Sequence, residues 1–140
     1  MAMEWNNNLS TGVMWQDRQH KELFKRVNKL LDAMTVGLGK EEVGRLLKFL
    51  DEYFVVHFEA EEQAMTRCDY PDAVAHLSEH TRFIEDVSRL EAEAEAGAST
   101  TLVMQTQSKV VDWFINHIGE VDKKLGECIL KADSARKGKG

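Results

Sequence analysis

A single proline, Pro71, interrupts a chain of 140 residues whose apolar side chains otherwise recur every three or four positions. This spacing matches the period of an α-helix, and proline is tolerated only in the first turn of a helix. Helices of about 20 to 30 residues joined by short links pack antiparallel, which predicts an all-α protein, an up-down-up-down antiparallel four-helix bundle. The four helices are predicted over about 17–35, 40–67, 71–96 and 100–131.

The flanking segments divide the chain into three parts. Residues 1–16 do not follow a helical pattern, although Trp5 and Leu9 are apolar, so we expect an N-terminal arm packed on the bundle. The bundle itself is expected over 17–131, with Asp17 as the N-cap of its first helix. Residues 132–140 are short and basic, and we expect them to form a disordered tail.

Charge and cysteine content indicate which binding partners are unfavourable and which cellular compartment the protein occupies. The formal net charge of −6 argues against nucleic acid or an anionic membrane as a partner. No apolar run approaches the roughly 20 residues that a membrane-spanning helix needs. Two cysteines, Cys68 and Cys128, are too few for a disulfide framework, so we expect two free thiols and a cytoplasmic protein.

All five histidines fall on the predicted core stripes, together with two carboxylates. His57 and Glu61 are four residues apart, as are His76 and His80, so each pair shares one face of its helix. A lone histidine on such a face is usually a hydrogen-bonded core residue. Here every predicted helix contributes at least one, and burying so many polar groups is costly unless a metal satisfies them. The candidate ligands are His20, His57, Glu61, His76, His80, His117 and Asp122.

Seven ligands exceed the roughly four that one zinc takes and suit two octahedral transition-metal ions. Spacing assigns His76, His80 and His117 to one metal and leaves His20 and His57 for the other. The two carboxylates can bridge both metals because each has two oxygens. With a bridging oxide or hydroxide, the first metal has a full set of ligands, and the second keeps one open position for a small molecule.

One spacing does not fit an ideal helix. His117 and Asp122 are five residues apart, which corresponds to roughly 140° around an α-helix. Either the two side chains lie on opposite sides of the metal pair, or the helix widens locally into a π-type turn. The sequence leaves both alternatives open.

Five motifs surround these ligands, namely Asp17–Phe24, His57–Met65, Tyr70–Pro71, His76–His80 and His117–Asp122. Together they resemble the hemerythrin family in its bacterial single-domain form, bacteriohemerythrin, over about Trp5 to Leu130. The resemblance implies an oxygen-binding protein rather than an enzyme, with two oxo- or hydroxo-bridged non-haem Fe ions that bind O2 reversibly. It also implies that O2 is bound as hydroperoxide on the five-coordinate iron, the one of the His20 and His57 type.

The ligand balance favours O2 binding over oxidation. Carboxylate-rich sites stabilise highly oxidised iron, whereas five neutral imidazoles and two carboxylates do so less, and O2 should leave as O2. Six side chains, placed by their offsets from the ligands, are expected to line a dry O2 pocket, although they would be core residues in either case. They are Leu23, Phe58, Phe83, Trp113, Phe114 and Ile118.

Several functions stay open for such a centre. It could serve O2 storage, delivery or sensing, and the lack of a fused signalling domain favours storage or delivery. The main alternative is a di-iron enzyme acting on peroxide or NO, but only apolar side chains, and no general acid, are expected near the pocket. A further alternative is an O2- or redox-sensing interaction module in which the metal merely holds the bundle together.

Overall fold

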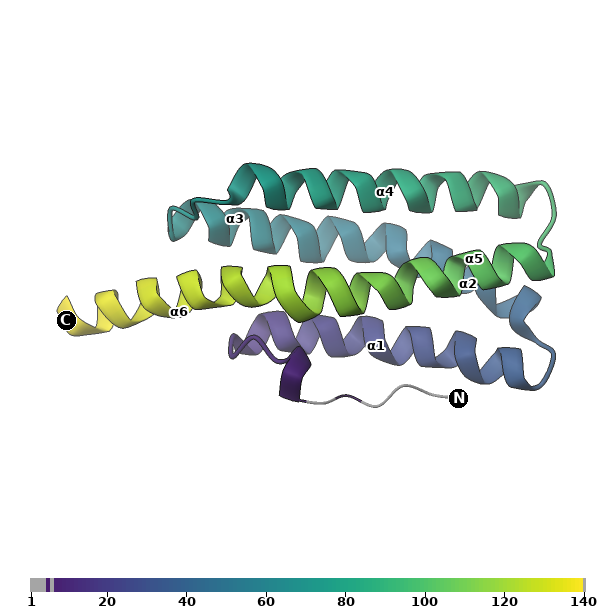
Figure 1. The fold of residues 1–140 in the computed structure, drawn as a ribbon, viewed down its shortest axis with the longest axis horizontal. Coiled ribbons are helices and arrows are strands. Elements are labelled where there is room, and N and C mark those ends of the chain that lie inside the picture. Colours follow the sequence, from purple (N-terminus) through teal and green to yellow (C-terminus); the bar gives the residue numbers. More distant parts are fainter. Residues whose placement is uncertain (1–4, 6, 140) are drawn as a thin grey trace.

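The computed structural model describes residue 5 and residues 7–139, without the side chains of residues 114 and 136–139. The described residues form helices joined by short turns and contain no strand. Four antiparallel rods pack side by side in up-down-up-down order, which confirms the predicted four-helix bundle (Figure 1). The first and third rods are α1 (Met14–Thr35) and α4 (Ala73–Glu95). The second joins α2 (Gly39–Tyr53), η2 (Phe54–Phe58) and α3 (Glu59–Arg67), and the fourth joins α5 (Thr100–Asp112), η3 (Trp113–Val121) and α6 (Asp122–Lys139).

The rods end where the sequence changes character. Gly37 and Gly97 follow α1 and α4 with φ angles of 78° and 127°, a left-handed conformation that glycine adopts without strain. Ser99 caps α5, because its side chain accepts a hydrogen bond of 3.1 Å from the Leu102 backbone N–H. The predicted start of the fourth helix near residue 100 is therefore confirmed.

Asp17 has a different role from the one predicted. The helix begins at Met14, so Asp17 lies in its first turn and is not the N-cap. Its carboxylate instead accepts hydrogen bonds from the Thr11 backbone N–H at 2.7 Å and the Ser10 hydroxyl at 2.7 Å. Burial raises the pKa of Asp17, but these bonds outweigh it and lower the pKa overall. The carboxylate thus fastens the loop that leads into the bundle.

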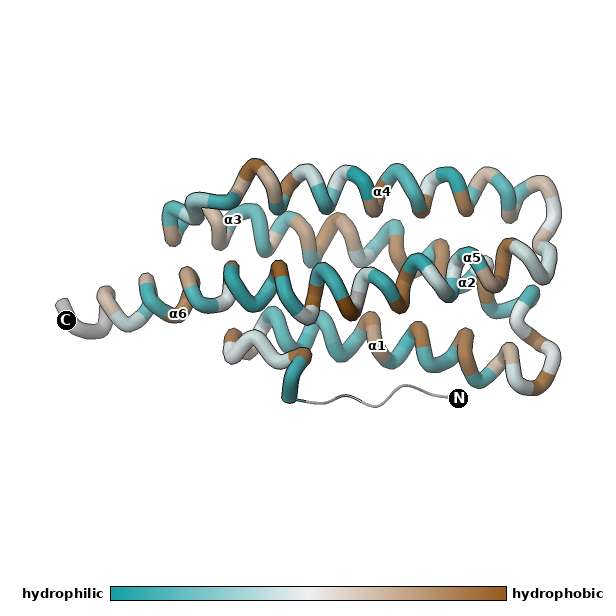
Figure 2. Tube along the Cα trace, viewed as in Figure 1, coloured by the Kyte–Doolittle hydropathy of each residue, from teal (hydrophilic) through white to brown (hydrophobic). Residues whose placement is uncertain are grey.

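Apolar residues fill the inside of the bundle in two clusters. Figure 2 shows hydrophobic positions recurring between hydrophilic ones along α1, α2 and α4, as helices with one buried face require. The larger cluster includes Val27, Leu50 and Val87, and Trp5 packs edge-on against Phe24 at 5.7 Å at its border. A smaller cluster lies near the turn between α3 and α4 and comprises Val13, Ala64, Met65, Tyr70, Leu125 and Ile129.

The C-terminal segment differs from the expected disordered tail. The helix α6 continues to Lys139 and runs beyond the ends of the other rods (Figure 1). Alanine has the highest helix propensity, and basic residues near a helix C-terminus interact favourably with its dipole. Both occur between Lys131 and Lys139. Within the described part of the chain, no helix is long and apolar enough to cross a membrane.

Candidate metal centre

The structure brings all seven candidate ligands together inside the bundle. Each of them is buried, with at most 2 % of its surface exposed. Every rod contributes, because the positions that continue the apolar stripes of the helices face the bundle axis. His20 comes from α1, His57 from η2, Glu61 from α3, His76 and His80 from α4, His117 from η3 and Asp122 from α6.

Two of these candidate ligands, His57 and His117, lie in π-helical segments. His117 belongs to η3, and Asp122 is the first residue after that segment. The Nε2 atom of His117 lies 3.0 Å from Asp122 Oδ1. A π turn holds one more residue than an α turn, so side chains five apart can reach the same point. Of the two alternatives for this spacing, the structure therefore shows the widened helix. The second π segment, η2 around His57, was not expected from the sequence.

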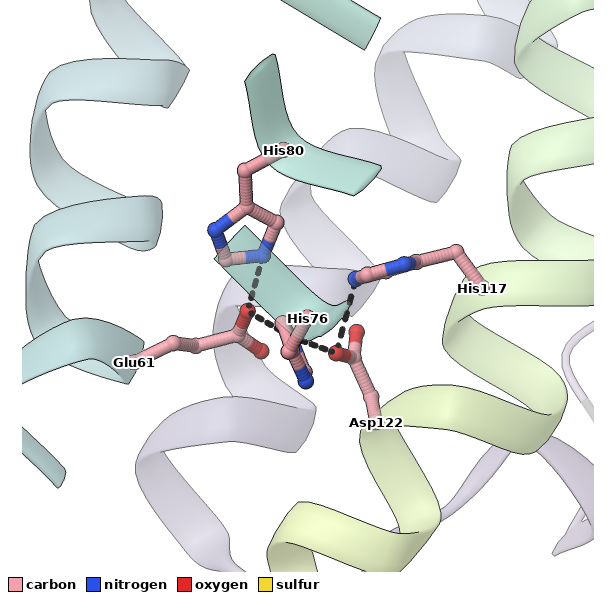
Figure 3. A group of neighbouring side chains, drawn as sticks. All are labelled: Glu61, His76, His80, His117 and Asp122. Atoms are coloured by element: carbon pink, nitrogen blue, oxygen red, sulfur yellow. Dashed lines mark hydrogen bonds and ion pairs between the residues drawn. The ribbon is translucent and has the colours of Figure 1, made fainter. Parts of the chain in front are cut away.

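The seven candidate ligands fall into one group of five residues and one of four, and both groups include the two carboxylates. The first group contains Glu61, His76, His80, His117 and Asp122 (Figure 3). The second contains His20, His57, Glu61 and Asp122. Within each group, one nitrogen or oxygen from every residue lies within 4.8 Å of the others. This is the division of ligands that the spacing predicts.

Each carboxylate turns one oxygen to each histidine group. Glu61 Oε1 lies 3.0 Å from His80 Nε2 and 3.4 Å from His76 Nε2, whereas its Oε2 lies 3.2 Å from His57 Nε2. Asp122 repeats the arrangement. Its Oδ1 lies 3.1 Å from His76 Nε2, and its Oδ2 lies 3.0 Å from His20 Nε2. Two carboxylates placed in this way can each bridge two cations.

The residues fit a pair of transition-metal ions. Four buried polar atoms lack a partner with hydrogen-bond geometry among the described residues, namely His80 Nε2, His117 Nε2 and both Asp122 oxygens. Each nevertheless lies close to a polar atom of another candidate ligand. A buried polar atom left unsatisfied costs about 1–3 kcal/mol, so several of them together need another partner. Imidazole nitrogens with carboxylate oxygens form a donor set that suits such ions.

The electrostatics of the site favour a cation. Burial lowers the pKa of His20 and His76, but hydrogen bonds and charges from Asp122 and Glu61 outweigh it and raise both to about 9. Burial raises the pKa of Glu61, yet the facing histidines hold it well below its usual range, and Asp122 is lowered likewise. The carboxylates therefore stay ionised and retain protons on two histidines, protons that a bound metal displaces.

Three further side chains, not expected from the sequence, contact candidate ligands and fix their orientation. His57 Nδ1 lies 2.6 Å from Gln19 Oε1, and His117 Nδ1 lies 3.0 Å from Glu79 Oε1. An oxygen acceptor at Nδ1 places the proton there and leaves Nε2 free to bind a metal. Gln16 donates a hydrogen bond of 2.8 Å to Glu61 Oε2. The only sequence signal for Gln19 and Glu79 is that each directly precedes a candidate ligand histidine.

The residues expected to line an O2 pocket are buried where their side chains are described, and the side chain of Phe114 lies outside that description. Phe58 stacks on His80 at 3.8 Å, and Trp113 stacks on His117 at 3.7 Å. Phe83 in turn stacks on Trp113 at 4.1 Å. Leu23 and Ile118 are fully buried in the larger cluster. Their role in an O2 pocket stays a prediction.

The surroundings of the site are not purely apolar, contrary to the expectation. Tyr53 is buried, and its ring stacks on His57 at 4.7 Å. Its hydroxyl has no hydrogen-bond partner in the described part of the chain. Burial, followed by the negative charges of Glu61 and Asp122, raises the pKa of Tyr53 well above its ordinary value. The sequence signal for this residue is its position four residues before His57, on the same face of the helix.

Comparisons with known proteins agree with this geometry. Residues 11–129 match the domain described as the hemerythrin HHE cation binding domain. A bacteriohemerythrin from Methylococcus capsulatus is 38% identical over 119 residues, which cover 85% of this chain and 89% of that protein. A hemerythrin-like protein from Naegleria gruberi is 28% identical over 86% of this chain and 87% of its own length. A crystal structure of wild-type hemerythrin superposes with a TM-score of 0.79 at 36% identity, over 92% of this chain and 98% of the other. The chain belongs to the hemerythrin family.

Proposed function

We propose that this protein binds O2 reversibly at a non-haem di-iron centre and serves to store, deliver or sense O2. The observation that carries the proposal is the unequal division of the donors. One group offers five residues and the other four, and both carboxylates belong to both groups. With one further bridging oxygen, the group that contains His20 and His57 leaves a position free for a small ligand.

Two irons held by these seven residues would supply the two electrons needed to bind O2 as hydroperoxide on the less saturated iron, and a bridging hydroxide would supply the proton. The residues of the protein would position the two irons, balance their positive charge and shield the site from water. Glu61 and Asp122 bring two negative charges to the metal pair, and Gln19 and Glu79 orient His57 and His117. Buried apolar side chains around the histidines exclude water, which slows loss of the bound species.

Two considerations support binding over oxidation. Five neutral imidazoles and two carboxylates stabilise highly oxidised iron less than a carboxylate-rich site does. The similarity to bacteriohemerythrins from several bacteria points in the same direction.

The test begins with anaerobic loading of the purified protein with Fe(II). Elemental analysis should give about two irons per chain, and aeration should produce a peroxo-to-iron absorption band that disappears when O2 is removed. Glu61→Ala should abolish the band, because Glu61 belongs to both groups, whereas the matched change Glu59→Ala at an exposed position should retain it. A single zinc per chain, or a loaded protein without the reversible band, would contradict the proposal. Steady turnover of peroxide or NO would indicate the enzyme instead.

A further inference from the structure

The candidate centre is layered along the bundle axis. The rods are antiparallel, so moving along the axis from the histidines means moving forward on α1 and α4 but backward on η2 and η3. One side of the histidines holds the two carboxylates and Gln16, which reaches Glu61. The other side holds one residue from each rod, which we call the interior layer: Leu23, Tyr53, Phe83 and Trp113.

The interior layer covers the side of the centre opposite the carboxylates. Tyr53 precedes His57 by four residues, and Trp113 precedes His117 by four, so each lies about one helical turn from its histidine. Their rings stack on those histidines at 4.7 and 3.7 Å. A ligand in a free coordination position on this side would therefore meet the interior layer and not the carboxylates.

Two buried hydrogen-bond donors lie in this layer without a partner among the described residues: the Tyr53 hydroxyl and Trp113 Nε1. The two side chains stack on histidines that belong to different groups of candidate metal ligands. Trp113 stacks on His117, which belongs to the five-residue group. Tyr53 stacks on His57, which belongs to the four-residue group, the one that offers fewer ligand atoms to a metal.

We propose that the Tyr53 hydroxyl donates a hydrogen bond to a small ligand bound at the metal of the His20–His57 group. The favoured ligands are those with a second acceptor atom beyond the one that coordinates, such as azide or a two-oxygen species. A hydroxyl buried without a partner is costly, and a ligand at this position satisfies it. The inference rests on the proposed function, because it requires a metal in this group, and it adds a ligand-selecting residue to it.

Azide binding to the diferric protein tests the proposal by optical titration. Tyr53→Phe removes only the hydroxyl and should weaken azide binding about tenfold to a hundredfold, as expected for a hydrogen bond to a charged group. Tyr70→Phe is the matched control, because Tyr70 belongs to the smaller cluster on the other side of the centre. It should leave azide affinity unchanged.

Two further measurements separate ligand selection from a structural role. Without metal, Tyr53→Phe should melt no lower than the parent protein, since the hydroxyl it removes has no partner among the described residues. The infrared stretch of bound azide should shift between H2O and D2O in the parent protein and in Tyr70→Phe, but not in Tyr53→Phe.

Equal azide affinity in the parent and in Tyr53→Phe would overturn the proposal, as would a parent protein whose azide stretch is indifferent to D2O. If Tyr53→Phe retained no iron, the infrared result on the parent protein would still show whether bound azide accepts a hydrogen bond. A parent protein that takes up no iron contradicts the proposed function itself, so the two failures can be told apart.

Discussion

Gln16 and Glu61 stand 45 residues apart in the sequence and are joined by a buried hydrogen bond of 2.8 Å. The bond fixes the oxygen of Glu61 that faces His57 and thereby orients the carboxylate between the two histidine groups. Gln16→Met keeps the length of the side chain but removes the donor, and we expect iron affinity to fall about tenfold to a hundredfold. Competition with a graded series of chelators measures this. Gln63→Met at an exposed position is the control, and equal iron retention in both variants would rule out an orienting role.

Single ligand substitutions should separate shared from unshared ligands. His117→Ala removes a member of one group and His20→Ala a member of the other, so each should retain about one iron per chain. Glu61→Ala removes a member of both groups and should lose both irons. Elemental analysis after gel filtration provides the count. If every substitution lost the same fraction of iron, the division into two groups would be wrong.

The lifetime of bound O2 should depend on the apolar side chains next to the centre. Leu23→Ala or Ile118→Ala should admit water and speed decay of the oxygenated form severalfold, while iron content stays the same. Val27→Ala is the control, because Val27 is equally buried on α1 but lies one turn further from His20. Slow optical decay measures the effect. Equal decay rates in all three variants would place the O2 pocket elsewhere.

The cysteines should be dispensable for O2 binding. The Cys128 thiol donates a hydrogen bond of 3.1 Å to the Cys68 carbonyl, at the edge of the smaller cluster. Serine can donate the same bond, so Cys68→Ser and Cys128→Ser should retain two irons and the reversible absorption band. Loss of the band in either variant would show that a thiol contributes to the centre.

Glu91 should make stability depend on pH away from the metal centre. Burial, followed by a hydrogen bond with Asp51, raises its pKa from 4.5 to about 7 in the folded protein. The unfolded chain releases this proton at the lower value, so the stabilisation is complete below pH 4.5 and is lost as the pH rises through 7. Glu91→Gln mimics the protonated form and should melt with the parent at pH 5 but above it at pH 8. Exposed Glu93 provides the control, since Glu93→Gln should leave the difference between the two pH values as in the parent.

The rods and the buried cluster of candidate ligands could be predicted because both follow the same period. Apolar residues on one helix face predict what is buried, and histidines on that face, such as His20 and His80, must then be buried as well. The two groups of candidate ligands could be predicted from the spacing along each rod and from the two oxygens of a carboxylate.

Other features depend on which helices meet and could not be read from one helix at a time. Gln16 and Tyr53 are unremarkable in a helical pattern, and their roles arise only from contacts with Glu61 and His57. The start of α1 was placed three residues late because Asp17 has the chemistry of an N-cap, whereas its hydrogen bonds run back to the preceding loop. The basic composition of residues 132–139 predicts disorder, whereas the structure continues α6 through them to Lys139.

The wide turn in η3 has a consequence for insertions and deletions. Val110 lies before this segment and Leu125 after it, and both are fully buried, so the helix presents the same face to the bundle on either side. An α-helix that gains one residue normally rotates everything beyond it by about 100°. Here the widened segment absorbs the extra residue, inside a helix and at a buried site. A histidine and the carboxylate that follows it in such a centre can therefore be four residues apart, as His57 and Glu61 are, or five, as His117 and Asp122 are. A sequence search that demands one fixed spacing would find only one of these two pairs.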